Sequence, residues 1–180
     1  MTMAEKPIGP YAKLPAVCEP WDPRAPEVAE RLARLIHAEA PDALVEHIGS
    51  SSVPGCAGKG VIDLQIVYAP SRLAAVKDAL ARLGFAPQVS RDPFPEERPM
   101  RVGSIAHDGT RYRIHAHVIA ADSPEVAETR GFRDRLRADA ALRDAYVARK
   151  RAIIAAGVTD SLDYAYAKGD FVQAALMGKL

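Results

Sequence analysis

The first regular pattern along the chain is a recurrence of hydrophobic residues at three- and four-residue spacing. It involves Val28, Leu32 and Ile36, between a proline at residue 23 and another at residue 41. This spacing places the hydrophobic side chains on one face of a helix, and prolines commonly flank helices. The pattern therefore predicts one amphipathic helix between the two prolines.

Two short runs rich in β-branched residues follow, Leu44–Ile48 and Val61–Tyr68. Runs of this length between glycine, proline and serine are typical of strands. Helical spacing then returns, with Ser71 as the expected N-cap and Gly84 as the stop signal. The hydrophobic positions of this second helix are Leu73, Val76, Leu80 and Leu83.

The second half of the chain predicts a hairpin followed by helices. Residues 100–106 and 111–120 are expected to be strands around Asp108-Gly109, because Asp-Gly is a favoured turn pair. Residues 91–99 are rich in proline and charge, so we expect a loop there and a candidate flap. Helical patterns then cover residues 124–138, 140–156 and 161–180.

This order of elements indicates an α/β (α+β) fold with a small mixed sheet, flanking helices and a helical C-terminal tail. We expect a single domain over residues 1–180, with the tail at residues 124–180. The proline-rich residues 1–20 are expected to run extended over the surface.

Charge and composition narrow the class of protein. The 180 residues carry 24 Lys and Arg against 23 Asp and Glu. This balance removes the electrostatic reason to expect general nucleic-acid or membrane binding, but it leaves room for a local basic pocket. Cys18 and Cys56 are too few for a disulfide scaffold and are expected to be reduced thiols. The sequence shows no apolar run of the roughly 20 residues that a membrane span needs and no signal-peptide core, so we expect a cytoplasmic protein.

The candidate chemistry lies between the first two strands and on the second. Asp63 and Gln65 alternate on one face of the Val61–Tyr68 strand, and a carboxylate there needs a partner, a metal or a solvated cleft. In the preceding loop, Gly49 permits unusual backbone angles. The backbone N–H groups and serine hydroxyls of this loop suit phosphate oxygens. Lys59 can add a positive charge. A flexible turn without a ligand is the alternative interpretation of the same residues.

A resemblance adds to this interpretation. The segment VEHIGSSSVPGCAGKGVIDLQI resembles the signature of the GrpB family, a branch of the DNA polymerase β-like nucleotidyltransferase superfamily. The likeness continues in RIHAHVIA, GFRDRLRADAALRDAYVARKRAI and DYAYAKGDFV, and it covers roughly residues 21–172. It implies a nucleotidyltransferase-like fold.

The resemblance also implies roles for residues. Gly49, Ser50 and Ser51 match the element that holds nucleotide phosphates, and Asp63 matches the first acid that binds Mg²⁺ for nucleotidyl or phosphoryl transfer. Gln65 stands in the place of the second acid. The third acid is missing as well, because residues 114–118 read IHAHV. The resemblance therefore supports the fold more strongly than the reaction.

Histidines stand where the third acid is expected. His115 and His117 share one face of a strand, and with Asp63 they form a candidate set that suits Zn²⁺ or Mn²⁺ better than Mg²⁺. We predict that at least one of the two faces the Asp63 cleft; hydrogen-bonded histidines at a sheet surface are the alternative. His47 is either a second cleft residue or a satisfied strand histidine.

Two residues of the helical tail complete the candidates. Arg133 is expected to reach a phosphate, unless it belongs to a solvated, salt-bridged face. Lys168 lies one helical turn after Tyr164, and the resemblance places this pair at the border of the cleft.

Three functions stay open on the sequence, as does the oligomeric state. The first is a nucleotidyl or phosphoryl transferase, the second a catalytically degenerate accessory domain that binds a nucleotide or phosphometabolite. The third is a metal-dependent enzyme built on Asp63, His115 and His117.

Overall fold

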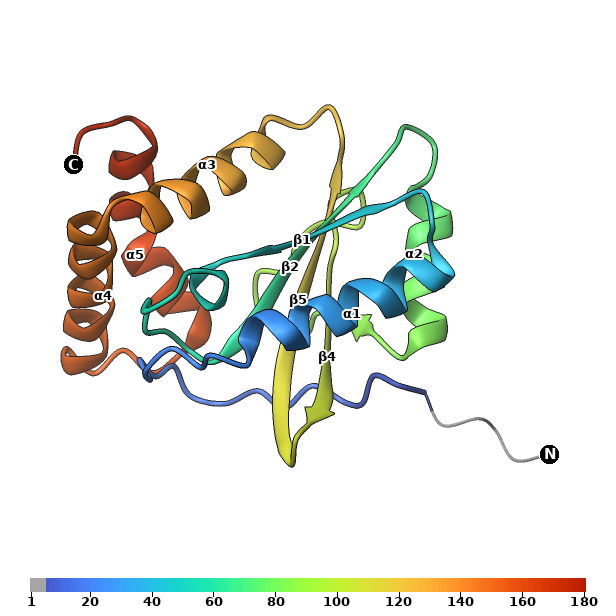
Figure 1. Ribbon diagram of the computed structural model, residues 1–180, viewed down its shortest axis with the longest axis horizontal. Helices are drawn as coiled ribbons and strands as arrows, with labels where there is room; N and C mark the ends of the chain where they lie inside the picture. The colour runs from blue at the N-terminus through green and yellow to red at the C-terminus, as the bar shows by residue number, and fades with distance from the viewer. Residues whose placement is uncertain (1–5) are drawn as a thin grey trace.

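The computed structural model describes residues 6–180 and contains a five-stranded mixed sheet with helices on both faces (Figure 1). The strand order is β1-β2-β5-β4-β3. Strands are β1 (Leu44–Ile48), β2 (Val61–Tyr68), β3 (Ala86–Pro87), β4 (Met100–His107) and β5 (Thr110–Ala120). Helices are α1 (Ala25–Glu39), α2 (Leu73–Leu83), α3 (Pro124–Ala138), α4 (Ala140–Ala155) and α5 (Ser161–Leu176). The α/β (α+β) prediction is confirmed.

The register of the central strands positions the candidate chemistry. Strand β2 pairs antiparallel with β1 and parallel with β5, and α2 begins the long connection between β2 and β5. In the parallel pair, Asp63 lies opposite His115, and Gln65 lies opposite His117. Alternation on a strand puts these four side chains on the same face of the sheet.

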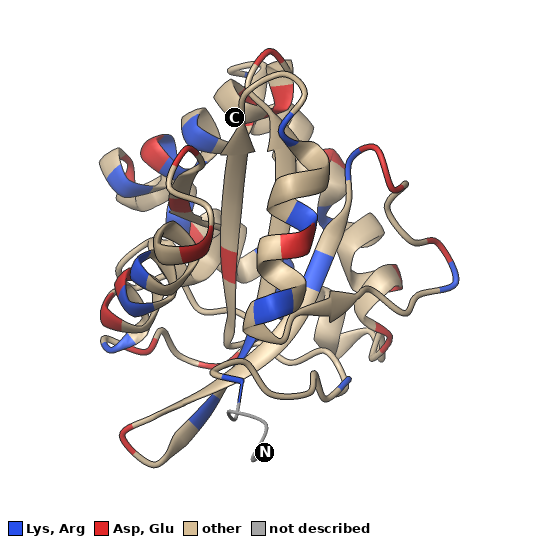
Figure 2. Ribbon diagram, turned by 90° about the vertical axis from the view of Figure 1, so that its right-hand side faces the viewer, with Lys and Arg blue, Asp and Glu red and all other residues tan. Residues whose placement is uncertain are grey.

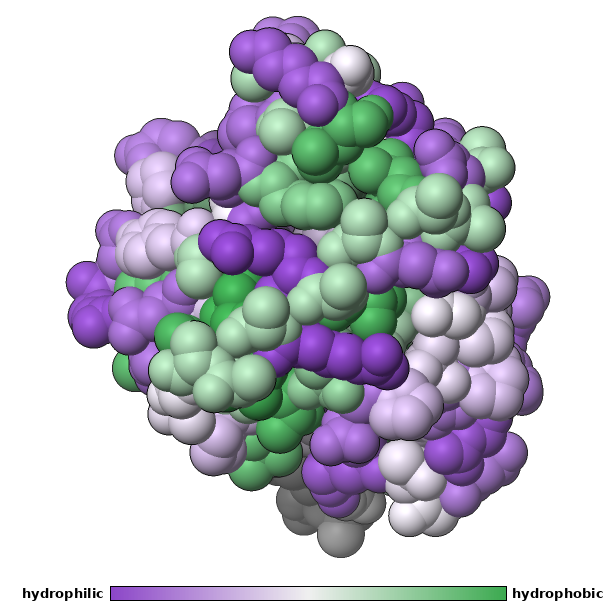
Figure 3. Space-filling model, turned by 90° about the vertical axis from the view of Figure 1, so that its left-hand side faces the viewer, coloured by the Kyte–Doolittle hydropathy of each residue, from purple (hydrophilic) through white to green (hydrophobic). Residues whose placement is uncertain are grey.

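The two faces of the sheet bury different cores. Ile62, Leu64 and Ile66 of β2 pack with the apolar faces of α1 and α2. On the other face, the tail helices α3–α5 enclose a second cluster that includes Val53 and Tyr146. Figure 1 shows these tail helices grouped at one end of the molecule, and Figure 3 shows that hydrophobic positions on their outer side lie between hydrophilic ones.

The N-terminal segment is extended, as predicted, but it does more than run over the surface. The backbone N–H of Ile8 donates to Leu83 at 3.0 Å, and Gly9 forms a bridge to Ser104 of β4. The Ile8 side chain is only 3% exposed and belongs to the main core. The segment therefore closes one edge of the core. Residues 1–5 of the predicted segment lie outside the described residues.

The predicted elements differ from the structure in two places. Ser71 does not cap α2: its φ is +66°, and Arg72 occupies the N-cap without a side-chain cap. A backbone turn after β2 therefore starts this helix. The two-residue strand β3 escapes the sequence pattern, because it is too short to show alternation.

The surface mixes charges of both signs. Figure 2, which views the side on which α2 lies, shows basic and acidic positions interspersed. Cys18 and Cys56 are both free thiols. Among the helices of residues 6–180, none has the length and apolarity needed to cross a membrane.

Candidate functional site

A cavity of about 350 Å³ lies between the sheet and the helical tail. Its lining includes seven residues predicted from the sequence: Gly49, Ser50, Ser51, Lys59, Asp63, His117 and Lys168. Phe94 and Arg98, from the predicted flap, also contribute to the lining. The cavity therefore brings together the loop, the carboxylate and one helical lysine, although this lysine lies more than 100 residues from the other two in sequence.

Gly49 lets the loop approach Asp63 closely. Its φ of +69° and ψ of −174° fall in a region that essentially only glycine adopts. A Cβ atom at this position would lie 2.6 Å from Asp63 Oδ2. The following turn, Ser50–Ser52, is fastened by the Ser52 hydroxyl, which donates to the Gly49 carbonyl at 2.7 Å. The loop is thus held directly against the acid.

Asp63 faces both histidines of β5. Its Oδ1 lies 3.4 Å from His115 Nδ1 and 3.7 Å from His117 Nε2. One donor atom from each of the three side chains lies within 4.8 Å of the others. The prediction that at least one histidine faces the Asp63 cleft is confirmed, because His117 lines the cavity.

Each histidine has a further partner on its other ring nitrogen. His115 Nε2 and the Tyr11 hydroxyl are hydrogen-bonded at 2.9 Å, and Arg98 Nη1 lies 3.2 Å from His117 Nδ1. Burial lowers the pKa of His117, although Asp63 opposes this shift. Burial alone would raise the pKa of Asp63, but hydrogen bonds and charge from His115 and His117 outweigh it and hold this pKa well below its ordinary value.

Lys59 and Lys168 line the cavity, and a third lysine, which the sequence analysis missed, contacts Ser50 of that lining. Lys150 of α4 is 1% exposed, and its Nζ donates to Ser50 Oγ at 2.8 Å and to the Ala57 carbonyl. Its Nζ also lies 4.3 Å from the centre of the Tyr146 ring. Tyr146 and Lys150 repeat the one-turn spacing of Tyr164 and Lys168, and this repeat is the signal that could have revealed Lys150.

Lys59 and Lys168 both lie near the ring of Tyr164. Their Nζ atoms are 5.3 and 5.6 Å from the centre of its ring. Burial lowers the pKa of Lys59 to about 8. The Tyr164 hydroxyl is buried and has no hydrogen-bond partner among residues 6–180. Within the same residues, Lys59, Lys150 and Lys168 form no ion pair with a carboxylate.

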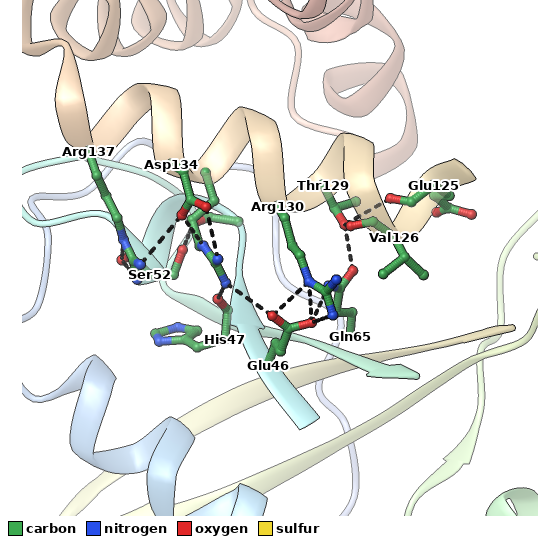
Figure 4. Close-up of polar contacts among 12 residues, drawn as sticks. Glu46, His47, Ser52, Gln65, Glu125, Val126, Thr129, Arg130, Asp134 and Arg137 are labelled. Atoms are coloured by element: carbon green, nitrogen blue, oxygen red, sulfur yellow. Dashed lines mark hydrogen bonds and ion pairs between the residues drawn. The ribbon is translucent and has the colours of Figure 1, made fainter. Parts of the chain in front are cut away.

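Gln65 belongs to a network behind the cavity rather than to its lining (Figure 4). The side chain is fully buried, and its Nε2 donates to Glu46 Oε2 at 2.7 Å. The Thr129 hydroxyl donates to Gln65 Oε1, and Arg130 Nε donates to Glu46 at 2.8 Å. Both ends of the Gln65 carboxamide are therefore engaged by protein groups.

Arg133 and His47 also lie behind the cavity wall. Arg133 donates to the His47 carbonyl at 3.2 Å and forms an ion pair with Asp134 at 2.7 Å. His47 Nε2 is hydrogen-bonded to Ser51 Oγ at 2.9 Å, and burial lowers the pKa of His47 to about 4. His47 thus contacts the loop through Ser51, Arg133 contacts β1, and neither lines the cavity, so both stay candidate ligand-binding residues by prediction only.

Comparison with known proteins decides the family. The family described as GrpB protein matches residues 15–177. The UPF0157 protein SCO7215 of Streptomyces coelicolor is 38% identical over 141 residues, which cover 78% of this chain and 71% of that protein. The chain belongs to the GrpB family. A second UPF0157 protein, BH1888 of Halalkalibacterium halodurans, is 31% identical over 157 residues, covering 85% of this chain and 76% of that protein.

Solved structures agree with this GrpB fold. The crystal structure of GrpB from Enterococcus faecalis superposes with a TM-score of 0.67 at 24% identity, covering 91% of this chain and 99% of that one. Cid1, described with RNA terminal uridylyl transferase activity, superposes with a TM-score of 0.51 at 17% identity. That match covers 72% of this chain and 39% of Cid1. The GrpB-family chain thus has a nucleotidyltransferase-like fold.

Proposed function

We propose that the cavity binds a nucleotide or another phosphorylated small molecule together with a divalent metal ion, and transfers its nucleotidyl or phosphoryl group. The observation that carries this proposal is that Lys59 and Lys168 line one cavity, that Lys150 is bonded to Ser50 of the same lining, and that none of the three has a carboxylate partner among residues 6–180. Buried charges are costly unless they are compensated, and a phosphate compensates several lysines at once.

The phosphate is expected at the Gly49-Ser50 loop. Lys150 already donates hydrogen bonds to Ser50, Cys56 and Ala57, so we expect it to orient the loop and to contribute positive potential. Lys59 and Lys168 form no ion pair with a carboxylate among residues 6–180 and are expected to donate directly to the phosphate. The Tyr164 hydroxyl, which has no hydrogen-bond partner among residues 6–180, supplies another donor at the same wall.

The divalent ion is expected at Asp63, His115 and His117. The three ligand atoms lie close enough to share one ion, and a set of one carboxylate and two imidazoles suits Zn²⁺ or Mn²⁺ better than Mg²⁺. A bound ion would neutralise charge on the transferred phosphate group. The family resemblance, in which Asp63 matches the first metal-binding acid, also favours a divalent ion as the cofactor at this position.

A specific observation favours a second function. The Gln65 network leaves no carboxylate in the place of the second metal ligand, and transfer with two metal ions needs several negative ligands. A catalytically degenerate module that binds the same ligand without turnover is therefore the alternative. Labelled nucleoside triphosphates distinguish the two: a transferase releases pyrophosphate or passes on the labelled phosphate, and the module does neither.

Thermal unfolding tests the binding proposal itself. Nucleoside triphosphates and inorganic tripolyphosphate would be screened with Mg²⁺, Mn²⁺ and Zn²⁺. A ligand at 100 times its Kd stabilises by roughly 2.7 kcal/mol, which raises Tm by about 5–10 °C for a chain of this size.

The matched variants are Lys168→Met and Lys13→Met. Both remove one positive charge, but Lys13 lies outside the cavity, in an exposed ion pair with Asp160. We expect Lys168→Met to lose most of the ligand-induced shift and Lys13→Met to keep it. Equal shifts in the two variants, or no shift with any phosphate ligand in the wild type, would contradict the proposal.

A further inference from the structure

Arg98 connects the flap, helix α3 and the candidate metal ligands. Its Nε donates to Glu125 Oε2 at 2.8 Å, and its Nη2 donates to the other oxygen of the same carboxylate. Its Nη1 reaches His117 Nδ1 at 3.2 Å, and its Cζ lies 4.3 Å from the centre of the Phe94 ring. The side chain is 20% exposed and lines the cavity. These contacts fix the guanidinium beside the imidazole.

The chemistry of the two groups determines where the His117 proton lies. A guanidinium has five N–H donors and no acceptor, so His117 Nδ1 must offer its lone pair to Arg98. A neutral imidazole carries one proton, which is then on Nε2. Nε2 is the atom that faces Asp63 Oδ1, at 3.7 Å. A protonated ring nitrogen has no lone pair for a metal ion.

His115 does not have this restriction. Its second nitrogen is hydrogen-bonded to the Tyr11 hydroxyl, and a hydroxyl both donates and accepts. The Tyr11 contact is therefore compatible with either tautomer of His115, including the one whose Nδ1 lone pair is free to bind a metal ion beside Asp63. Of the two imidazoles, His117 is the one held in a single tautomer by its neighbour.

We infer that Arg98 is a positioning residue that holds His117 in the tautomer unable to bind a metal, so that a metal ion enters the site only when Arg98 leaves His117 Nδ1. This inference rests on the proposed metal site. Metal-binding histidines usually donate their second N–H to an acceptor, and Arg98 supplies the opposite, a donor. Arg98 thus lowers the metal affinity of the unliganded protein.

Three variants of the full chain test this with Zn²⁺ and Mn²⁺ alone, in calorimetric titrations. Arg98→Gln can accept the Nδ1 proton through its carbonyl and still donate to Glu125. Arg98→Met fills similar space with no polar group. Arg91→Met is the control, because Arg91 ties the same loop to Asp160 and does not contact His117. It loosens the flap without changing the imidazole.

We expect both Arg98 variants to bind metal more tightly than the wild type, by about ten- to hundredfold, with Arg98→Gln at least equal to Arg98→Met. Arg91→Met should match the wild type. Equal or weaker binding in the Arg98 variants, while the wild type binds metal, overturns this inference and leaves the proposed metal site standing. If neither the wild type nor any variant binds metal, both the inference and the proposed metal site fail.

A second readout needs no metal. Long-range ¹H–¹⁵N spectra report which ring nitrogen is protonated, and His117→Gln assigns the signals. We expect the metal-free wild type to hold His117 with the proton on Nε2, and Arg98→Met to lose this preference. The same tautomer in both proteins would show that Arg98 does not position the ring.

Discussion

Substituting Gly49 by alanine should destabilise the protein through two separate costs. The backbone at Gly49, with φ +69° and ψ −174°, lies in a region that costs a non-glycine residue about 1–3 kcal/mol. The new methyl group would also lie 2.6 Å from Asp63 Oδ2 and 3.0 Å from Asp63 Cβ. Forcing an extra methyl group into such a contact costs about another 1–3 kcal/mol. We therefore expect a loss of several kcal/mol in the free energy of unfolding.

Gly60→Ala is the matched control for this substitution. Gly60 also has a positive φ, +68°, but a Cβ there would meet nothing within 4 Å. Urea unfolding compares the two variants, because both place a side chain at a positive φ and only Gly49→Ala also has the contact with Asp63. If the free energy of unfolding falls equally in the two variants, Gly49 does not lie in close contact with Asp63, and this part of the site description is wrong.

Three shorter predictions concern His47, Lys59 and Asp63. Burial lowers the pKa of His47 to about 4, so the unfolded chain binds a proton at His47 more readily than the folded protein does. The free energy of unfolding is therefore highest above pH 6.5 and falls by on the order of 2–3 kcal/mol as the pH drops towards 4. His47→Gln should flatten that part of a urea-unfolding profile, and an unchanged profile would contradict the shift. Because the pKa of Lys59 is lowered to about 8, affinity for a phosphate ligand should fall between pH 7 and 9, and Lys59→Met should remove most of this dependence in calorimetry. Asp63→Asn should lower Tm of the metal-free protein at neutral pH, because His115 and His117 hold the pKa of Asp63 below its ordinary value and thereby stabilise the ionised carboxylate in the folded state; an unchanged Tm would contradict that shift.

The fold was largely predictable because its elements have strong local patterns. The strands Leu44–Ile48 and Val61–Tyr68 and the helix Pro124–Ala138 have the predicted bounds, since β-branched runs and a Ser-Pro start mark them. The family resemblance supplied the nucleotidyltransferase-like arrangement. Ser71 was misread because a serine before a helix suggests a cap, whereas the backbone turn, with a positive φ, is set by the tertiary structure.

The site was predictable where residues share a strand and less so where distant segments meet. The family resemblance, together with alternation on each strand, predicted that His115 or His117 faces Asp63, but no local pattern shows that Lys150 reaches Ser50 across 100 residues. The resemblance placed Gln65 at the position of the second acid. Its partners Glu46 and Thr129 come from β1 and α3, and only the three-dimensional structure brings them to Gln65.

The most direct test of the central claim is whether phosphate ligand and metal share the Asp63 site. A non-hydrolysable nucleoside triphosphate would be titrated calorimetrically into the wild type and Asp63→Asn, with and without Mn²⁺. We predict that Mn²⁺ tightens nucleotide binding to the wild type by about tenfold or more, and that this gain is lost in Asp63→Asn. The same gain in both proteins, or nucleotide binding that ignores Mn²⁺ in the wild type, would contradict a metal ion held between Asp63 and the phosphate.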